Sequence, residues 1–379
     1  MNKVDAVSAA PGKADRRPIR ILHTEWSGGW GGQEMRIVDE MLAVRERGIE
    51  VYLASTAHSK ITAQAKQQGI PVFILPFRGN ADLKTLWGLY RLIKTQHIDV
   101  VNTHSGKDTW VGGFAAKLAG AKFIRTRHLS NRINPSRFNF IHKLADFIIT
   151  TGESVRADLI AYNRISSAKI ASIPTGIDDK VYARQLFDRA ANRQKFAIAD
   201  HEIAIGLVAI LRNFKRHDLF LDMAKELYSR YENLKFFIAG DGPKHEEIAN
   251  KIVKAQLERK VIMTGYLPRP AELLSALDIF TLTSDRFEGV PQAVMQALMM
   301  ELPVVATSAG STGDLYHDDN FQLVAPGELA PLVAAVESLI TDQNKRLYYA
   351  SRARAYVVQK YSRTVMTERL LDIYQQLLG

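Results

Sequence analysis

Short apolar runs rich in β-branched residues alternate with amphipathic segments along the whole chain. This alternation is typical of a parallel sheet that is covered by helices on both faces. In the first half it predicts strands at 19–22, 51–54, 72–75, 99–103, 122–126 and 146–150. It predicts helices between them at 33–47, 82–96 and 108–118. We therefore expect the first half to form a doubly wound parallel sheet.

The second half repeats the pattern, with predicted strands at 203–210, 234–240, 260–265, 278–283, 303–307 and 321–325. Residues 173–182 contain Pro, Gly and paired Asp, as expected of a link between two units. The sequence thus predicts an α/β protein with two Rossmann-like, doubly wound domains facing a central cleft. We expect the chain to begin with a disordered tail at 1–18, followed by a first domain at 19–175 and a second domain at 176–360. A C-terminal helix at 361–379 is expected to cross back to the first domain.

Composition limits the class of protein. A length of 379 residues suits two domains, and 46% apolar with 24% charged residues is ordinary for a globular chain. Cysteine is absent, which excludes disulfides, thiolate metal sites and cysteine nucleophiles. No apolar run reaches the length of a signal peptide or a spanning helix. We therefore expect a cytoplasmic location.

The net charge of +10 is unevenly distributed. Residues 1–175 hold 25 Lys and Arg against 14 Asp and Glu, whereas the remainder holds 25 against 26. A basic first half attracts anionic partners such as nucleic acid, anionic lipid or a phosphorylated glycan. A basic surface that serves only solubility is the alternative.

A glycine-rich loop follows the first predicted strand, within residues 23–36. Gly28, Gly29, Gly31 and Gly32 permit positive φ and close backbone approach, and the helix after them offers free N–H groups to an anion. The loop is therefore a candidate phosphate loop, or else a flexible turn. Its spacing, and the lack of an acid after the second strand, do not match the dinucleotide fingerprint.

Two histidines stand at neighbouring strand ends in the first half. His104 ends the fourth predicted strand, and His128 follows the fifth together with Arg125 and Arg127. Either imidazole could bind a sugar hydroxyl or a developing charge without a metal, although a structural role is the alternative. A zinc site needs a third ligand in the same place, and none is evident.

The second half has cations and a carboxylate in the corresponding loops. Arg212 and Lys215 follow its first strand, where two fixed cations could hold a diphosphate and stabilise it as a leaving group. A solvated basic turn is the alternative. Glu288 and Gly289 precede a helix that begins near Pro291, so a carboxylate and free backbone N–H groups lie together. This combination suits a sugar nucleotide.

From Arg20 to Tyr374 the chain resembles the GT-B glycosyltransferases of family 4. The most specific segment is EGVPQAVMQALMMELPVVAT at 288–307, which is similar to the donor motif of that family. Four further segments agree in order and spacing: DVVNTHS at 99–105, RTRHLS at 125–130, AGDGP at 239–243 and TGYLP at 264–268. The resemblance implies that the second half binds a nucleotide sugar and the first half binds the acceptor.

The resemblance also implies roles for individual residues. The catalytic group would be His128, Arg212, Lys215 and Glu288. Donor contacts would come from Gly31, Gly32, Gly240, Gly265, Tyr266, Gly289, Val290, Gln292 and Gln296. Acceptor contacts would come from Gln33, His104, Arg127 and Arg132. Within this set Arg212 and Lys215 would hold the diphosphate.

Three positions depart from the family pattern. Gln296 stands where a second glutamate usually binds the ribose, so we expect an altered nucleotide preference. Ile210 replaces an arginine two residues before Arg212, and Arg216 replaces the glycine after Lys215. These two changes imply a diphosphate contact of altered geometry.

The expected reaction retains the anomeric configuration of a UDP- or GDP-linked sugar. No Asp-x-Asp pair occurs in the chain, so we expect neither a metal nor another cofactor. The expected acceptor is an anionic or lipid-linked glycan of bacterial envelope polysaccharide or lipopolysaccharide synthesis, not nucleic acid. The basic segment 117–143, which includes Arg132, Arg137 and Lys143, would contact the inner face of the membrane. A sugar-nucleotide epimerase of the same fold and a catalytically silent glycan-binding protein are the alternatives.

Overall fold

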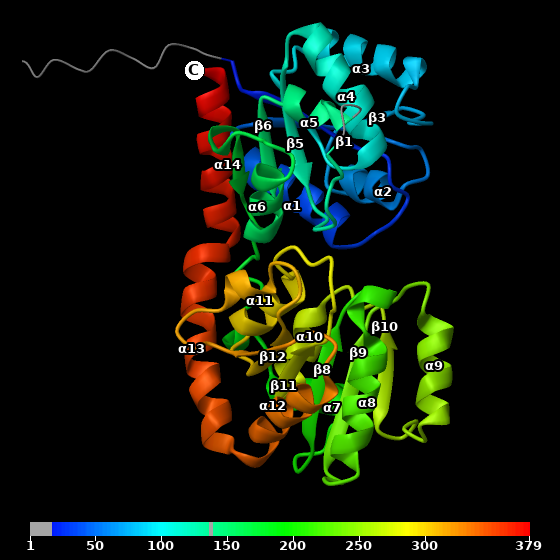
Figure 1. Cartoon of the computed structure of the whole chain (residues 1–379), viewed down its shortest axis with the longest axis vertical. Helices are drawn as coiled ribbons and strands as arrows, with labels where there is room; N and C mark the ends of the chain where they lie inside the picture. Colours follow the sequence, from blue (N-terminus) through cyan, green and yellow to red (C-terminus); the bar gives the residue numbers. More distant parts are fainter. Residues whose placement is uncertain (1–16, 136–138) are drawn as a thin grey trace, which may run out of the picture.

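The computed structural model describes residues 17–135 and 139–379, which form two α/β domains stacked along the long axis of the molecule (Figure 1). Residues 1–16 of the predicted tail and Arg137 of the predicted basic segment lie outside the described residues. Among those described, no helix is both long enough and apolar enough to cross a membrane.

The first domain contains a seven-stranded parallel sheet of order β3-β2-β1-β4-β5-β6-β7. Its strands are β1 Arg20–Glu25, β2 Glu50–Ser55, β3 Val72–Ile74, β4 Val100–Thr103, β5 Lys122–Arg127, β6 Phe147–Thr150 and β7 Ile170–Ser172. The six predicted strands are confirmed, whereas β7 was not predicted. This strand has only three residues, of which Ile170 alone is buried, so it leaves no apolar run in the sequence.

Strand β1 runs three residues beyond its predicted end at Leu22. His23, Thr24 and Glu25 continue it in register with β2 and are fully buried. Polar side chains can extend a buried strand when other polar groups satisfy them. Here Thr24 donates to Asp108 at 2.8 Å and Glu25 accepts from Ser105 at 2.7 Å.

Helices cover both faces of this sheet (Figure 1). They are α1 Gly32–Arg45, α2 Lys60–Gln67, α3 Leu83–Thr95, α4 Gly106–Ala119, α5 Ile141–Leu144 and α6 Glu153–Ala161. Local capping explains several starting points. Asp82, for example, accepts hydrogen bonds from the N–H groups of Lys84 and Thr85 at the start of α3.

The second domain contains a six-stranded parallel sheet of order β10-β9-β8-β11-β12-β13. All of its strands were predicted: β8 Ile203–Val208, β9 Leu234–Ala239, β10 Val261–Gly265, β11 Ile279–Leu282, β12 Val304–Thr307 and β13 Gln322–Val324. Its helices are α7 Arg189–Lys195, α8 His217–Tyr228, α9 His245–Lys254, α10 Pro270–Ala276, α11 Gln292–Met299, α12 Leu329–Thr341 and α13 Gln343–Tyr361.

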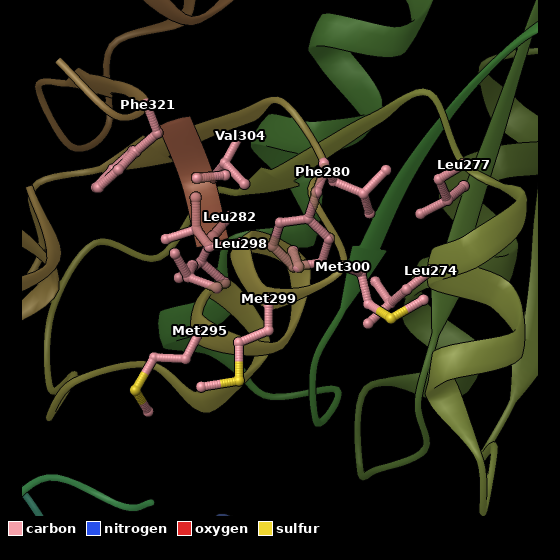
Figure 2. Close-up of a cluster of buried hydrophobic side chains, with 14 of the residues drawn as sticks. Leu274, Leu277, Phe280, Leu282, Met295, Leu298, Met299, Met300, Val304 and Phe321 are labelled. Atoms are coloured by element: carbon pink, nitrogen blue, oxygen red, sulfur yellow. The ribbon is translucent and has the colours of Figure 1, made fainter. Parts of the chain in front are cut away.

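Helix α11 is embedded in the core of the second domain. Leu298 packs with Leu282 of β11 and Val304 of β12, and Met299 is likewise fully buried (Figure 2). Each such side chain contributes about 1.5–3 kcal/mol by leaving water. The helix is therefore firmly held, and it fixes the position of the loop before it.

The chain crosses between the domains twice, at adjacent places. The N–H of Ile177 donates to the carbonyl of Tyr361 at 2.9 Å, and the N–H of Arg363 donates to the carbonyl of Ile177 at 2.8 Å. After the second crossing, α14 Arg363–Leu378 runs beside the first domain (Figure 1). Leu370 and Tyr374 of this helix are buried in the core of that domain, as the crossover prediction required.

Candidate functional site at the domain boundary

Loops at the carboxyl ends of strands in the two domains meet directly. Among the hydrogen bonds that join them are Trp30 Nε1 to Tyr266 Oη at 3.2 Å, Gln292 Nε2 to the Gly32 carbonyl at 2.8 Å, Val290 N to the Thr151 carbonyl at 3.0 Å, and Ser154 Oγ with Ser311 Oγ at 2.6 Å. Open parallel sheets bind ligands at this end of their strands. The domain boundary is therefore the place to look for a site.

Lys215 and Glu288 form a mostly buried ion pair on the second domain. Lys215 Nζ lies 2.5 Å from Glu288 Oε1, and the two side chains are 14% and 8% exposed. Ser284 Oγ donates to the same carboxylate oxygen at 2.5 Å. The pair forms because β8 and β11 are neighbours in the sheet, so the loops that follow them meet.

Arg212 and Arg216 flank this ion pair differently. Arg212 is exposed and has no ion-pair or hydrogen-bond partner for its side chain within residues 17–135 and 139–379, so it is available to an anion. Arg216 adopts a left-handed backbone, with φ 49° and ψ 50°. Glycine adopts this left-handed conformation without strain, whereas a residue with a Cβ does not. Arginine in place of the family's glycine at position 216 therefore carries a cost in backbone strain. Its side chain bonds Asp218 at 3.0 Å.

Close backbone contacts require glycine around Glu288. A Cβ atom on Gly310 would lie 2.0 Å from the Glu288 carbonyl oxygen, and one on Gly289 would lie 2.4 Å from Thr151 Oγ1. Gly240, with φ 145°, could not carry a Cβ because the Ala209 carbonyl oxygen would be 1.9 Å away. Gly289 therefore lets the carboxylate loop approach the first domain closely, whereas Gly310 and Gly240 allow close backbone packing within the second domain.

The predicted donor residues of the second domain have different surroundings. The N–H of Val290 already donates to Thr151, so a sugar could reach that amide only after this bond opens. Gly265 has φ 70°, and its neighbour Tyr266 is 53% exposed. Gln296 lies on α11 and is buried.

The glycine-rich loop of the first domain differs from the predicted phosphate loop. None of its glycines takes a positive φ. The N–H of Gly31 donates to the Glu34 carboxylate at 2.9 Å. The N-terminus of α1 is therefore already bound by a carboxylate from its own first turn. Gly32 approaches the second domain closely, since a Cβ there would lie 3.0 Å from Gln292 Nε2 and this side chain would have to shift.

His104 and His128 lie together, as their strand-end positions suggested, and the buried His23 joins them. His104 Nδ1 lies 3.0 Å from His128 Nε2, and His104 Nε2 lies 2.9 Å from His23 Nδ1. Burial lowers the pKa of His23 to about 3. Burial, with smaller effects of Arg36 and Arg125, also holds the pKa of His104 and His128 well below the usual range. All three rings are therefore neutral near pH 7.

A second buried polar cluster lies beside the histidines. Glu25 accepts hydrogen bonds from Gln33 at 2.5 Å, Ser105 at 2.7 Å and the N–H of Ser27 at 2.7 Å. Burial, followed by the charge of Asp108, raises the pKa of Glu25 to about 8. Burial raises the pKa of Asp108 to about 6. The predicted acceptor residue Gln33 is therefore oriented by a carboxyl group that is largely protonated near pH 7.

The other two predicted acceptor residues bond elsewhere in the protein. Arg127 donates to the carbonyl of Asn131 at 2.5 Å, and burial lowers its pKa to about 10. Arg132 pairs with Asp158 at 3.0 Å and covers the ring of Tyr162 at 4.4 Å. Neither side chain joins the histidine row.

His23, Glu25 and Asp108 were not predicted as site residues. The sequence predicts a loop at His23 and Glu25 because both residues are polar, whereas β1 includes them. Their spacing was the missed signal, since His23 and Glu25 are two residues apart and side chains two apart in a strand share a face. Over residues 17–135 and 139–379, no group of three His, Cys, Asp or Glu is placed to hold a metal ion.

Two family models match successive parts of the chain. Residues 30–181 match glycosyltransferase family 4, and residues 188–356 match glycosyl transferases group 1. Together they cover most of both domains, including Lys215, Glu288 and the strand ends that bear His104 and His128.

Individual relatives agree with these models. EpsF of Bacillus subtilis is 27% identical over 223 residues, which are 55% of this chain and 57% of that protein. The UDP-Gal:alpha-D-GlcNAc-diphosphoundecaprenol alpha-1,3-galactosyltransferase of Escherichia coli is 23% identical over 311 residues, or 77% of this chain and 79% of the enzyme. The crystal structure of Anabaena HepE in complex with UDP-glucose superposes with a TM-score of 0.82 at 22% identity, covering 94% of this chain and 100% of HepE.

Proposed function

The chain belongs to the family 4 glycosyltransferases of the GT-B fold, and we propose that it moves a sugar from a nucleotide diphosphate donor to a glycan or lipid-linked acceptor. The observation that carries this proposal is the convergence of three groups at the domain boundary. They are the Lys215–Glu288 pair, the exposed Arg212, and the histidine row of the first domain. Thr151 links the two sides, since its carbonyl accepts from Val290 and its hydroxyl donates to the carbonyl of His128 at 3.0 Å.

The proposed chemistry uses fixed charges at the leaving group. Arg212 and Lys215 stabilise the negative charge that develops on the departing diphosphate, a role that is typically worth 10²–10³-fold in turnover per contact. Glu288 accepts hydrogen bonds from hydroxyl groups of the transferred sugar. The acceptor hydroxyl attacks the anomeric carbon from the face that the diphosphate leaves, and the leaving phosphate takes the proton, so the anomeric configuration is retained.

A product assay tests the transfer. UDP-glucose and UDP-galactose are the first donors to try, because HepE was crystallised with the former and the Escherichia coli relative is named for the latter. We expect a glycoside whose anomeric proton coupling matches that of the donor. An inverted glycoside would contradict retention, and a free epimer would contradict transfer. Full activity in excess EDTA is expected, and loss of activity with rescue by manganese would contradict metal-independent catalysis.

We further propose that helix α3 carries the membrane contact of the acceptor domain. Its sequence LKTLWGLYRLIKT contains three basic residues and no acid. Leu83 is 76% exposed and Trp87 is 53% exposed, and Arg91 lies 5.3 Å from the centre of the Trp87 ring. An exposed Leu–Trp face flanked by cations suits an anionic lipid surface.

The surroundings of α3 favour this face over the basic segment 117–143. Lys117 is paired with Asp146 at 2.7 Å and Arg132 with Asp158, so these charges are engaged within the protein. Beside Trp87 a cavity of about 500 Å³ lies against the residues that follow β2 and β3. It therefore lies at the carboxyl edge of the sheet that also bears the histidines.

Vesicle sedimentation tests the surface. The Leu83→Ala/Trp87→Ala variant should lose binding to vesicles that contain phosphatidylglycerol but keep its activity on a water-soluble acceptor. Leu118→Ala is the matched control, because Leu118 is 64% exposed on α4 of the same domain. Unchanged binding by the double variant would contradict the assignment to α3. Equal binding of wild-type protein to neutral phosphatidylcholine vesicles would contradict the role of the cations.

A further inference from the structure

The three histidine rings form a row that leads from the core of the first domain to its boundary with the second. His23 is 0% exposed, His104 is 1% exposed and His128 is half-buried. The rings of His23 and His104 stack with centroids 5.1 Å apart and planes 8° apart. The row therefore has one buried end and one outer end.

The register of the sheet explains the row. His23 of β1 is level with Asn102 of β4, which is level with Ile124 of β5. His104 stands two residues beyond Asn102, and His128 stands four residues beyond Ile124. Side chains on one face of a strand recur at every second residue. From β1 to β4 and from β4 to β5, each ring is consequently placed two residues further toward the carboxyl end of the sheet than the ring before it.

Hydrogen bonding between neutral rings couples their tautomers. A neutral imidazole has one N–H donor and one bare nitrogen acceptor. The two bonds in the row use both nitrogens of His104, one nitrogen of His23 and one of His128. Only two arrangements satisfy both bonds, one with every N–H on Nδ1 and one with every N–H on Nε2.

The buried end of the row distinguishes these arrangements. His23 Nε2 is buried and has no hydrogen-bond partner in the part of the chain that the structure describes. If every N–H is on Nδ1, this atom is a bare acceptor; otherwise it is an N–H donor. Buried donors without a partner are rarer in proteins than underused acceptors. The structure therefore favours Nδ1–H throughout the row.

We propose that His23 and His104 are positioning residues that hold His128 in its Nδ1–H form. The free nitrogen of His128 is then a donor and not a base. Its consequence for catalysis rests on the function proposed above. His128 donates a hydrogen bond to an oxygen of the bound donor sugar, while the proton of the acceptor goes to the leaving phosphate.

The tautomers can be observed without any substrate. Protein with ¹⁵N-labelled histidine should show one-bond and long-range ¹H–¹⁵N couplings that place the proton of His23, His104 and His128 on Nδ1 near pH 7. Assignment uses single His→Gln variants. A proton on Nε2 of His128 in the wild-type protein would overturn the inference, whether or not transferase activity is found.

Two substitutions of nearly equal size then differ only in whether residue 23 donates a hydrogen bond to His104 or accepts one from it. In His23→Asn the side-chain amide can still donate at the position of Nδ1, whereas in His23→Asp the carboxylate can only accept. We expect His23→Asn to keep the Nδ1–H form of His128 and nearly wild-type turnover. His23→Asp should reverse the row, move the proton of His128 to Nε2 and lower kcat about tenfold, the effect of losing one hydrogen bond.

His58→Asp is the control for added charge, because His58 is exposed in the same domain. It should change neither the tautomer of His128 nor kcat. If folded His23→Asp protein keeps Nδ1–H at His128, the row does not control the tautomer and the inference fails. If His23→Asp does not fold, the wild-type spectrum still decides. Absence of transferase activity together with three Nδ1–H signals would instead refute the proposed function alone.

Discussion

Replacement of Lys215 by alanine should damage both turnover and stability, for separate reasons. Lys215 Nζ lies 2.5 Å from Glu288 Oε1, with 14% and 8% of the two side chains exposed. Without the lysine, the hydroxyl of Ser284 is the one hydrogen-bond partner that the described residues leave to the carboxylate. Breaking a buried pair in this way costs roughly 3 kcal/mol, the lower end of the usual range, because the site is not completely dry. In a domain of this size the melting temperature should fall by about 6–12 °C.

Turnover should fall by about 10²–10³-fold in the same variant, because a cation is lost at the leaving diphosphate. Arg212→Ala separates the two effects. Arg212 is exposed and its side chain has no partner within residues 17–135 and 139–379, so this variant should lose turnover while its stability stays within about 0.5 kcal/mol of wild type. Lys254→Ala, on the exposed face of α9, is the control and should change neither quantity.

The measurements are thermal unfolding followed by circular dichroism and steady-state transfer from the nucleotide sugar. Adding Glu288→Gln to Lys215→Ala removes the stranded charge, so it should restore much of the stability but none of the turnover. Wild-type melting of Lys215→Ala would refute the buried-pair argument. Normal turnover of a destabilised Lys215→Ala protein would refute the diphosphate role and leave the pair purely structural.

Three other predictions use different parts of the site. The pKa of Glu25 is raised from 4.5 to about 8, so between these pH values the native state holds a proton that the unfolded chain has released. The free energy of unfolding should therefore fall as the pH rises through this range. Urea titrations of Glu25→Gln should show a weaker dependence of stability on pH. An unchanged slope would mean that another group is responsible. Arg216→Ala should be about 1 kcal/mol less stable than Arg216→Gly, because alanine keeps the left-handed strain; the reverse order would contradict the backbone assignment. Gln296→Glu should lower the donor KM about fivefold, because a hydrogen bond to a carboxylate is about 1 kcal/mol stronger than one to an amide, and an unchanged KM would remove position 296 from the ribose contact.

Local pattern determined much of this fold. Twelve of the strands in the two sheets follow from apolar runs, because a strand buried on both faces has to be apolar along its length. The same pattern placed Arg212, Glu288, His104 and His128 at strand ends, where parallel sheets of this class bind ligands. In the motif that begins at Glu288, Gly289 allows close approach to Thr151 and the buried helix α11 fixes the position of the carboxylate loop.

Tertiary structure alone decided which of these groups touch. Lys215 and Glu288 are 73 residues apart and meet because β8 lies beside β11, not because of any local signal. His23 and His104 are 81 residues apart and meet because β1 lies beside β4. The order of strands depends on how the helices pack across the whole sheet, whereas a polarity pattern reports only the burial of each residue. For that reason the buried His23 and Glu25 resembled loop residues in the sequence, and only the folded sheet shows them as the inner part of the site.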